Sequence, residues 1–142
     1  MDKKLIARAS VTVKASPARV WAALTTPAII KKYFFGSDIV TDWSVGSPIF
    51  YRGEWQGRAY EDKGKILKFE PEKLLVTTHW SPLSGVPDSP DNYHTVSYTL
   101  TPQGATTGVT ITQDNNATEE ERLHSEQNWK AVLEGLKKEV EG

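Results

Sequence analysis

The chain has 142 residues, of which 38% are hydrophobic and 25% are charged, a composition typical of a folded globular protein and too apolar for intrinsic disorder. Because this length suits one hydrophobic core, we expect residues 1–142 to form a single domain. Lys and Arg number 17 against 18 Asp and Glu, so nucleic acid is not an expected partner. The absence of Cys excludes disulfides, thiolate nucleophiles and Cys-based zinc sites.

The N-terminal residues also indicate the cellular compartment that we expect for the protein. Residues 1–8 turn polar before the apolar centre of a signal peptide could form, and no apolar run is long enough to cross a bilayer. We therefore expect a cytoplasmic protein with no membrane span.

The N-terminal part predicts one strand followed by two short helices. Residues 5–13 alternate between apolar and polar side chains, as in a half-buried strand. Ser16 and Pro17 indicate a helix start, because Ser caps free amides and Pro needs no N–H donor at the first helical position. The Thr-Pro pair at 26–27 repeats this signal, and Gly36 is expected to end the second helix.

The middle of the chain, residues 38–114, predicts an antiparallel meander. It is rich in β-branched and aromatic residues and is interrupted by Gly, Pro and Asp. The predicted strands are residues 38–43, 48–55, 58–69, 73–80, 93–101 and 107–114. Between the fourth and fifth of these, the proline-containing segment 81–92 is predicted to be a long exposed loop.

The C-terminal segment predicts a long amphipathic helix. Thr118 and Glu121 have the spacing of a capping box, in which each side chain accepts from a free backbone N–H group. Apolar residues then recur at helical spacing, at Trp129, Val132, Leu133, Leu136 and Val140. This apolar stripe is expected to lie against the sheet.

The chain resembles the START-like superfamily, also called SRPBCC. The resemblance rests on residues 15–25, 104–113 and 128–133 and on the order of the predicted strands and helices. The similarity is to the branch named after the C-terminal domain of the activator of the heat-shock-protein-90 ATPase. The resemblance implies an α+β helix-grip fold of the birch-pollen-allergen type, with a curved antiparallel sheet around the long C-terminal helix. It also implies an internal cavity, because relatives include lipid carriers, hormone receptors, plant defence proteins and aromatase or cyclase enzymes.

The candidate ligand-binding residues follow from strand alternation, which assigns side chains to the two faces of the sheet. The inner face is predicted to carry Tyr51, Thr78, Trp80, Tyr98 and Gln113, with Trp129 of the last helix as a cavity wall. Polar tips inside an apolar chamber can orient a ligand, or can be satisfied by water and neighbouring backbone groups.

The sequence predicts no catalytic residue, metal or cofactor. His79, His94 and His124 lack metal-ligand spacing, and His79 alternates outward from Trp80, so these histidines are interpreted as surface or structural residues. A Gly-x-Ser-x-Gly nucleophile elbow is absent as well.

Three functions are consistent with these patterns. The first is binding of a small hydrophobic or amphipathic molecule between sheet and helix, without catalysis. The second is a single-domain, cochaperone-like module that contacts a chaperone partner. The third is an enzyme of the aromatase or cyclase type, which would hold a reactive chain in the cavity.

Overall fold

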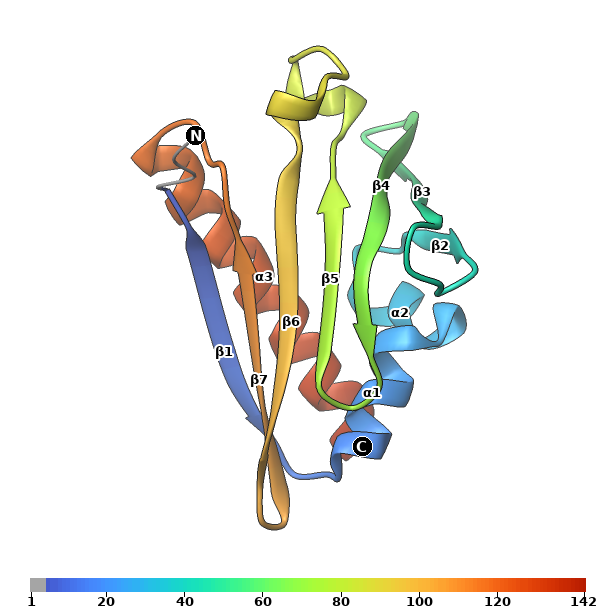
Figure 1. The fold of residues 1–142 in the computed structure, drawn as a ribbon, viewed down its shortest axis with the longest axis vertical. Helices are drawn as coiled ribbons and strands as arrows, with labels where there is room; N and C mark the ends of the chain where they lie inside the picture. The colour runs from blue at the N-terminus through green and yellow to red at the C-terminus, as the bar shows by residue number, and fades with distance from the viewer. Residues whose placement is uncertain (1–4) are drawn as a thin grey trace.

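Figure 1 shows the computed structural model, which describes residues 5–142 as a curved seven-stranded antiparallel sheet with a long helix lying across it. The strands are β1 (Ala7–Val13), β2 (Asp38–Thr41), β3 (Pro48–Trp55), β4 (Arg58–Glu70), β5 (Leu74–His79), β6 (His94–Gln103) and β7 (Thr106–Gln113). The helices are α1 (Pro17–Thr25), α2 (Pro27–Tyr33) and α3 (Glu119–Glu141), with short 3₁₀ turns η1 (Pro82–Ser84) and η2 (Pro90–Asn92). The strand order is β1-β7-β6-β5-β4-β3-β2, which confirms the predicted helix-grip fold.

Capping residues fix where the helices begin. The Ser16 hydroxyl accepts from the Arg19 amide at 3.3 Å at the start of α1. At the start of α3, the Thr118 hydroxyl accepts from the Glu121 amide at 3.0 Å, and the Glu121 carboxylate accepts from the Ala117 amide at 2.6 Å. Both predicted side chains therefore accept from free backbone N–H groups at the start of α3, although Glu121 bonds the residue before the N-cap and not the N-cap itself.

Helix α3 spans the concave face of the sheet, and its C-terminal half packs against α1 and α2 (Figure 1). Val132, Leu133 and Leu136 are at most 2% exposed and form the centre of this contact. A Cβ atom at Gly135 would lie 2.8 Å from the Cβ of Tyr33, so glycine allows α2 to approach α3 closely. No helix within residues 5–142 is long and apolar enough to cross a membrane.

Strands β4 and β5 approach each other unusually closely near Gly64. A Cβ atom at this position would lie 1.7 Å from the carbonyl oxygen of Thr78, so only glycine fits there. The regular β4–β5 ladder begins beyond this point, with Ile66 opposite Thr77. On the other side of Gly64 the backbones of the two strands pair in an isolated bridge between Lys63 and Trp80.

The predicted face of β5 is wrong by one residue. Thr77 is buried at 1% exposure and His79 lies on the same face, so Thr78 and Trp80 point away from α3. The prediction placed Trp80 on the inner face by alternation with Val76 and Thr78. Trp80 instead lies just beyond the end of β5, where its ring stacks on Tyr93 at a centroid distance of 6.4 Å.

The segment 81–92 is exposed, as predicted, although it also contains η1 and η2. It lies at the end of the molecule where α3 begins, above the ends of β5 and β6 (Figure 1).

Candidate functional site

The interior between the sheet and α3 contains an inner hollow and a larger mouth hollow. The inner hollow has a volume of about 30 Å³, close to the share of one water molecule in the liquid. Its walls are Leu24, Ile30, Tyr33, Phe34, Ile39, Trp43, Ile49, Tyr51, Leu75, Thr77, Tyr98 and Val132. The mouth hollow has a volume of about 220 Å³. Its walls are Phe34, Phe35, Ser37, Tyr51, Tyr60, Asp62, His79, Gln113, Ser125, Asn128, Trp129 and Val132.

Aromatic side chains separate the two hollows. Phe34 borders both and stacks on Tyr51 at a centroid distance of 5.8 Å. The Phe34 ring also meets Trp129 edge-on at 5.6 Å, and Tyr98 meets Trp129 edge-on at 5.9 Å. Phe35, which follows the C-terminus of α2, has a left-handed backbone with φ 52° and is 62% exposed. Phe34, Tyr51 and Val132 therefore form the partition between the inner hollow and the mouth hollow.

Gln113 joins the sheet to α3 at the wall of the mouth hollow. Its side-chain oxygen accepts from the Trp129 indole N–H at 2.8 Å. Its side-chain nitrogen donates to Asn116 Oδ1 at 3.1 Å and to Ser125 Oγ at 3.2 Å. Because these bonds use the Gln113 amide within the protein, its role in the fold is to position Trp129.

The tyrosines of the interior are held in their neutral form. Burial, partly opposed by the neighbouring Thr77 hydroxyl and reinforced by the negative charge of Asp62, raises the pKa of Tyr51 to about 12. Burial likewise raises the pKa of Tyr98 well above its ordinary value. Both phenols therefore remain uncharged hydrogen-bonding groups at neutral pH.

Asp62 and His79 form a pair at the mouth hollow. The distance from His79 Nε2 to Asp62 Oδ2 is 3.0 Å. The His79 side chain is 27% exposed and the Asp62 side chain is 16% exposed. Asp62 lies directly opposite Tyr51 in the β3–β4 ladder, and the His79 ring meets the Tyr51 ring edge-on at 5.2 Å. Two neighbouring strands thus bring an acid and an imidazole together beside an aromatic wall.

Sequence reasoning missed this pair. The prediction that His79 points outward was wrong because β5 was assigned to the opposite face. A signal was present in β4, where Asp62, Gly64 and Ile66 share one face and Ile66 is completely buried. Counting back from Ile66 places Asp62 on the inner side.

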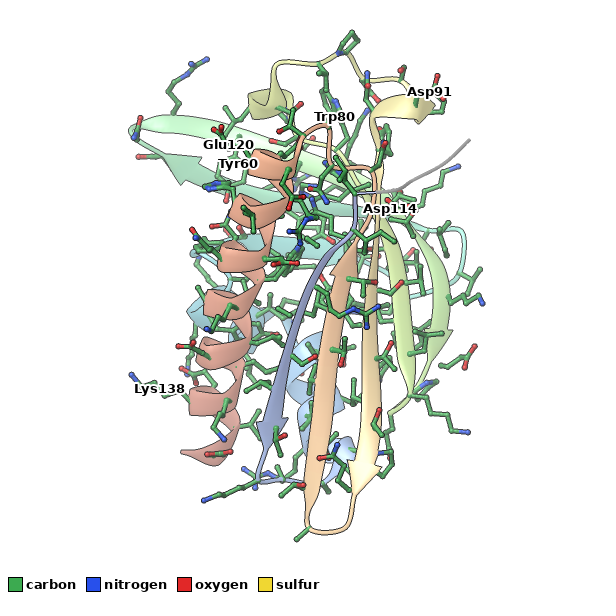
Figure 2. The ribbon with its side chains drawn as sticks, turned by 90° about the vertical axis from the view of Figure 1, so that its left-hand side faces the viewer. Tyr60, Trp80, Asp91, Asp114, Glu120 and Lys138 are labelled. Carbon is green, nitrogen blue, oxygen red and sulfur yellow. The ribbon has the colours of Figure 1, made fainter. Side chains whose placement is uncertain are left out.

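A further hollow lies under the segment 81–92. Trp80 and His79 line it, together with His94, whose Nδ1 lies 2.8 Å from the carbonyl oxygen of Asp114. Figure 2 shows Trp80, Asp91 and Asp114 at the end of the molecule where α3 begins, far from Lys138 near its other end. Because His79 lines both this hollow and the mouth hollow, it lies between them.

The structure brings together some of the predicted ligand-binding residues but not others. Tyr51, Gln113 and Trp129 line the mouth hollow, and Tyr98 lines the inner hollow. Thr78 and Trp80 line neither. Within residues 5–142, no group of three or more His, Cys, Asp and Glu side chains is arranged to hold a metal ion.

A curved sheet that grips a long C-terminal helix, with aromatic-lined hollows between them, defines a protein of the helix-grip class. The family described as activator of Hsp90 ATPase homolog 1-like protein matches residues 14–141. The chain belongs to this family, as its sequence patterns predicted.

Solved structures agree with this assignment. A solution structure from Cytophaga hutchinsonii is 52% identical, with a TM-score of 0.84 and coverage of 97% of this chain and 94% of the other. The Aha1 dimer from Colwellia psychrerythraea is 26% identical, with a TM-score of 0.73 and 96% coverage of both chains. DynU16, from the dynemicin biosynthetic locus, shares the fold at 19% identity and a TM-score of 0.78, covering 95% of this chain and 46% of its own. None of the proteins with curated functions matches the chain.

Proposed function

We propose that this chain, as a single cytoplasmic domain, binds a small hydrophobic or amphipathic molecule in the mouth hollow without transforming it. The observation that carries the proposal is the hollow itself, about 220 Å³ in volume and lined by aromatic rings from the segment after α2, the sheet and α3. The hollow opens to the surface next to the well-packed core, so a small molecule could enter it and lie against aromatic side chains. Family membership supports the same function, since helix-grip relatives include carriers of apolar molecules.

The volume restricts the size of the ligand. An engineered apolar cavity of roughly 150 Å³ holds benzene, whereas pockets for drug-sized molecules measure roughly 300–1,000 Å³. The mouth hollow lies between these values, which favours one ring, a fused pair of rings or a short chain. A longer molecule would need Phe34 to move and open the inner hollow beneath it.

The predicted residues take different parts in this proposal. Tyr51 and Trp129 supply aromatic walls, and Gln113 holds Trp129 in place through its hydrogen bond. Tyr98 lies in the inner hollow and would meet only a ligand that displaces Phe34.

The test is a fluorescence titration with an uncharged apolar probe, N-phenyl-1-naphthylamine. The wild type should bind it at one saturable site. Asn128→Trp, at an exposed wall position of the mouth hollow, should weaken binding by at least about tenfold, because the new ring occupies or covers the space.

Two tryptophan variants serve as controls. Gln127→Trp adds the same ring one residue away on α3 at an exposed position outside the mouth hollow, and Thr78→Trp adds it on the outer face of β5. Both should bind the probe as the wild type does. Absence of saturable binding in the wild type, or equal affinity in Asn128→Trp and Gln127→Trp, would contradict the proposal. Native mass spectrometry of protein purified from its own host should also show a retained small molecule.

A second candidate is a protein-interaction module with a chaperone partner. Its support is the relative from Colwellia psychrerythraea, which is described as an Aha1 dimer, together with exposed Phe35 and Val45 at 62% and 64%. Sedimentation of the purified chain and co-purification with a chaperone would test it. An aromatase-like or cyclase-like reaction is the third candidate, supported by the fold shared with a protein of a biosynthetic locus.

A further inference from the structure

The Asp62–His79 pair has one nitrogen that remains available for a ligand. An ionised carboxylate only accepts hydrogen bonds, so the 3.0 Å contact requires His79 Nε2 to carry the proton. In the neutral imidazole, Nδ1 then holds the lone pair and acts as an acceptor. Among residues 5–142 no hydrogen bond to His79 Nδ1 is formed, whereas His94 uses its Nδ1 on the Asp114 carbonyl oxygen.

Asp62 acts through His79 rather than by touching a ligand itself. Its Oδ2 atom is engaged by His79, and its Oδ1 atom is buried without a hydrogen-bond partner. With Oδ1 buried and Oδ2 bonded to His79, the imidazole is the group of this pair that we expect a ligand to contact. The negative charge behind the ring strengthens Nδ1 as an acceptor and fixes the tautomer.

The charges around the mouth hollow limit what the ligand can be. Among the described residues that line it, Asp62 is the one carboxylate, and neither Lys nor Arg is present. An anion such as a fatty-acid carboxylate would meet this negative charge without a cation to compensate it. An ammonium group would lose its hydration without direct access to a carboxylate oxygen, which is costly. A neutral molecule is therefore favoured.

The walls favour a ring over a flexible chain. Phe34, Tyr51 and Trp129 present aromatic surfaces to the hollow, and aromatic pairs gain about 0.5–1.5 kcal/mol beyond the area that they bury. His79 lies at the edge of this aromatic group, in contact with Tyr51. A ring seated against these side chains can direct one substituent to His79.

We propose that His79, positioned by Asp62, is the recognition point for the hydroxyl group of a small uncharged ring molecule, a phenol or a cyclic alcohol. This inference rests on the proposed ligand-binding function. The ligand hydroxyl donates to His79 Nδ1 while its ring lies against the aromatic wall. Asp62 is a positioning residue, and His79 is the group that touches the ligand.

The test compares 2-naphthol with 2-methoxynaphthalene, which has the same ring but no hydroxyl donor, and with 2-naphthoate, which is anionic. Wild-type protein should bind 2-naphthol at least about tenfold more tightly than 2-methoxynaphthalene, the factor expected for one hydrogen bond to an imidazole backed by charge. It should bind 2-naphthoate more weakly than either. Equal affinity for 2-naphthol and 2-methoxynaphthalene overturns this inference and leaves the proposed function standing, whereas binding of none of the three overturns both.

Substitutions of His79 test whether this residue causes the preference for 2-naphthol over 2-methoxynaphthalene. His79→Phe should bind both neutral probes with the affinity that the wild type shows for 2-methoxynaphthalene, and His79→Leu provides the same test if the larger ring prevents folding. His94→Phe is the matched control, because His94 lies opposite His79 in the β5–β6 ladder but lines the other hollow. Retention of the preference in both His79 variants, or its loss in His94→Phe, overturns the assignment.

The role of Asp62 has a spectroscopic readout. Nitrogen-15 NMR of the imidazole should show the Nε2–H tautomer for His79 in the wild type. Asp62→Asn should reduce both the population of this tautomer and the preference for 2-naphthol, while binding of 2-methoxynaphthalene is retained. A wild-type His79 in the Nδ1–H tautomer contradicts the proposal, because Nδ1 could not then accept.

Discussion

The interior has a closed end around the inner hollow and an open end around the mouth hollow. Both ends are built from the same sheet and the same helix, yet they differ in chemistry. At the closed end, Leu24, Ile30 and Leu75 leave a gap no larger than one water molecule. At the open end, Asp62 and His79 line a hollow about seven times as large, roughly 220 against 30 Å³. The open end keeps its space because polar side chains there are held by one another and by the backbone, so apolar groups cannot close over them.

Helix α3 shows the same contrast along its length. Its C-terminal half contributes Val132, Leu133 and Leu136 to the core, and glycine at position 135 lets α2 pack closely against it. Its N-terminal half contributes Ser125 and side chains that hydrogen-bond to the sheet. One helix thus stabilises the fold with one half and lines the mouth hollow with the other.

The largest expected effect is at the crossing of β4 and β5, which supports the open end. Gly64→Ala places a Cβ atom against the backbone oxygen of Thr78, which cannot move without disturbing β5. The free energy of unfolding should fall by at least about 3 kcal/mol, the upper range for overpacking. Urea denaturation measures it, with Lys65→Ala at the next, exposed position as the control. A Gly64→Ala protein as stable as Lys65→Ala would show that the strands do not approach as closely as described.

The second prediction separates stability from binding. Leu136→Ala removes a completely buried side chain at the closed end and should cost about 2–5 kcal/mol of unfolding free energy. Affinity for the naphthyl probes should be unchanged at temperatures where the variant remains folded. Loss of probe binding by the folded variant would mean that the two ends are not independent.

The third prediction concerns alkaline pH. Unfolded tyrosine ionises near pH 10, whereas the pKa of folded Tyr51 is raised to about 12. The neutral Tyr51 therefore contributes stability that is fully present below pH 10 and is lost as pH rises towards 12, up to about 3 kcal/mol. Tyr51→Phe should lose less stability than the wild type between pH 10 and 12. Identical slopes in denaturation series across this range would show that Tyr51 is more accessible than its burial implies.

The smallest expected effect is at the link between α3 and the sheet. Trp129→Phe removes the indole N–H that donates to Gln113 and should cost about 1 kcal/mol. The control is Trp80→Phe, which removes an exposed indole bond to the Val86 carbonyl oxygen and should change stability by less than about 0.5 kcal/mol. Thermal unfolding followed by circular dichroism would detect the difference, and equal losses would argue against the Gln113–Trp129 bond.

Local sequence patterns determined most of the elements of this protein. Ser16, Pro17 and Thr118 mark helix starts through short-range hydrogen bonds that need no tertiary partner, and the structure places α1 and α3 there. Alternation in residues 5–13 and 107–114 identified the inner face of β1 and β7 correctly, because one face of each strand is clearly the more apolar.

The candidate site was decided by the tertiary structure. In β5 both faces carry apolar or β-branched residues, so alternation alone could not say whether Thr77 or Thr78 points inward. The register between β4 and β5 decides which of the two threonines points inward, because Thr77 lies opposite the buried Ile66. The close contact at Gly64 sets where β5 crosses β4. That register places His79 beside Asp62, which is distant in sequence. A sequence pattern records the period of a strand, but only the packing of neighbouring strands fixes which of its two faces meets the helix.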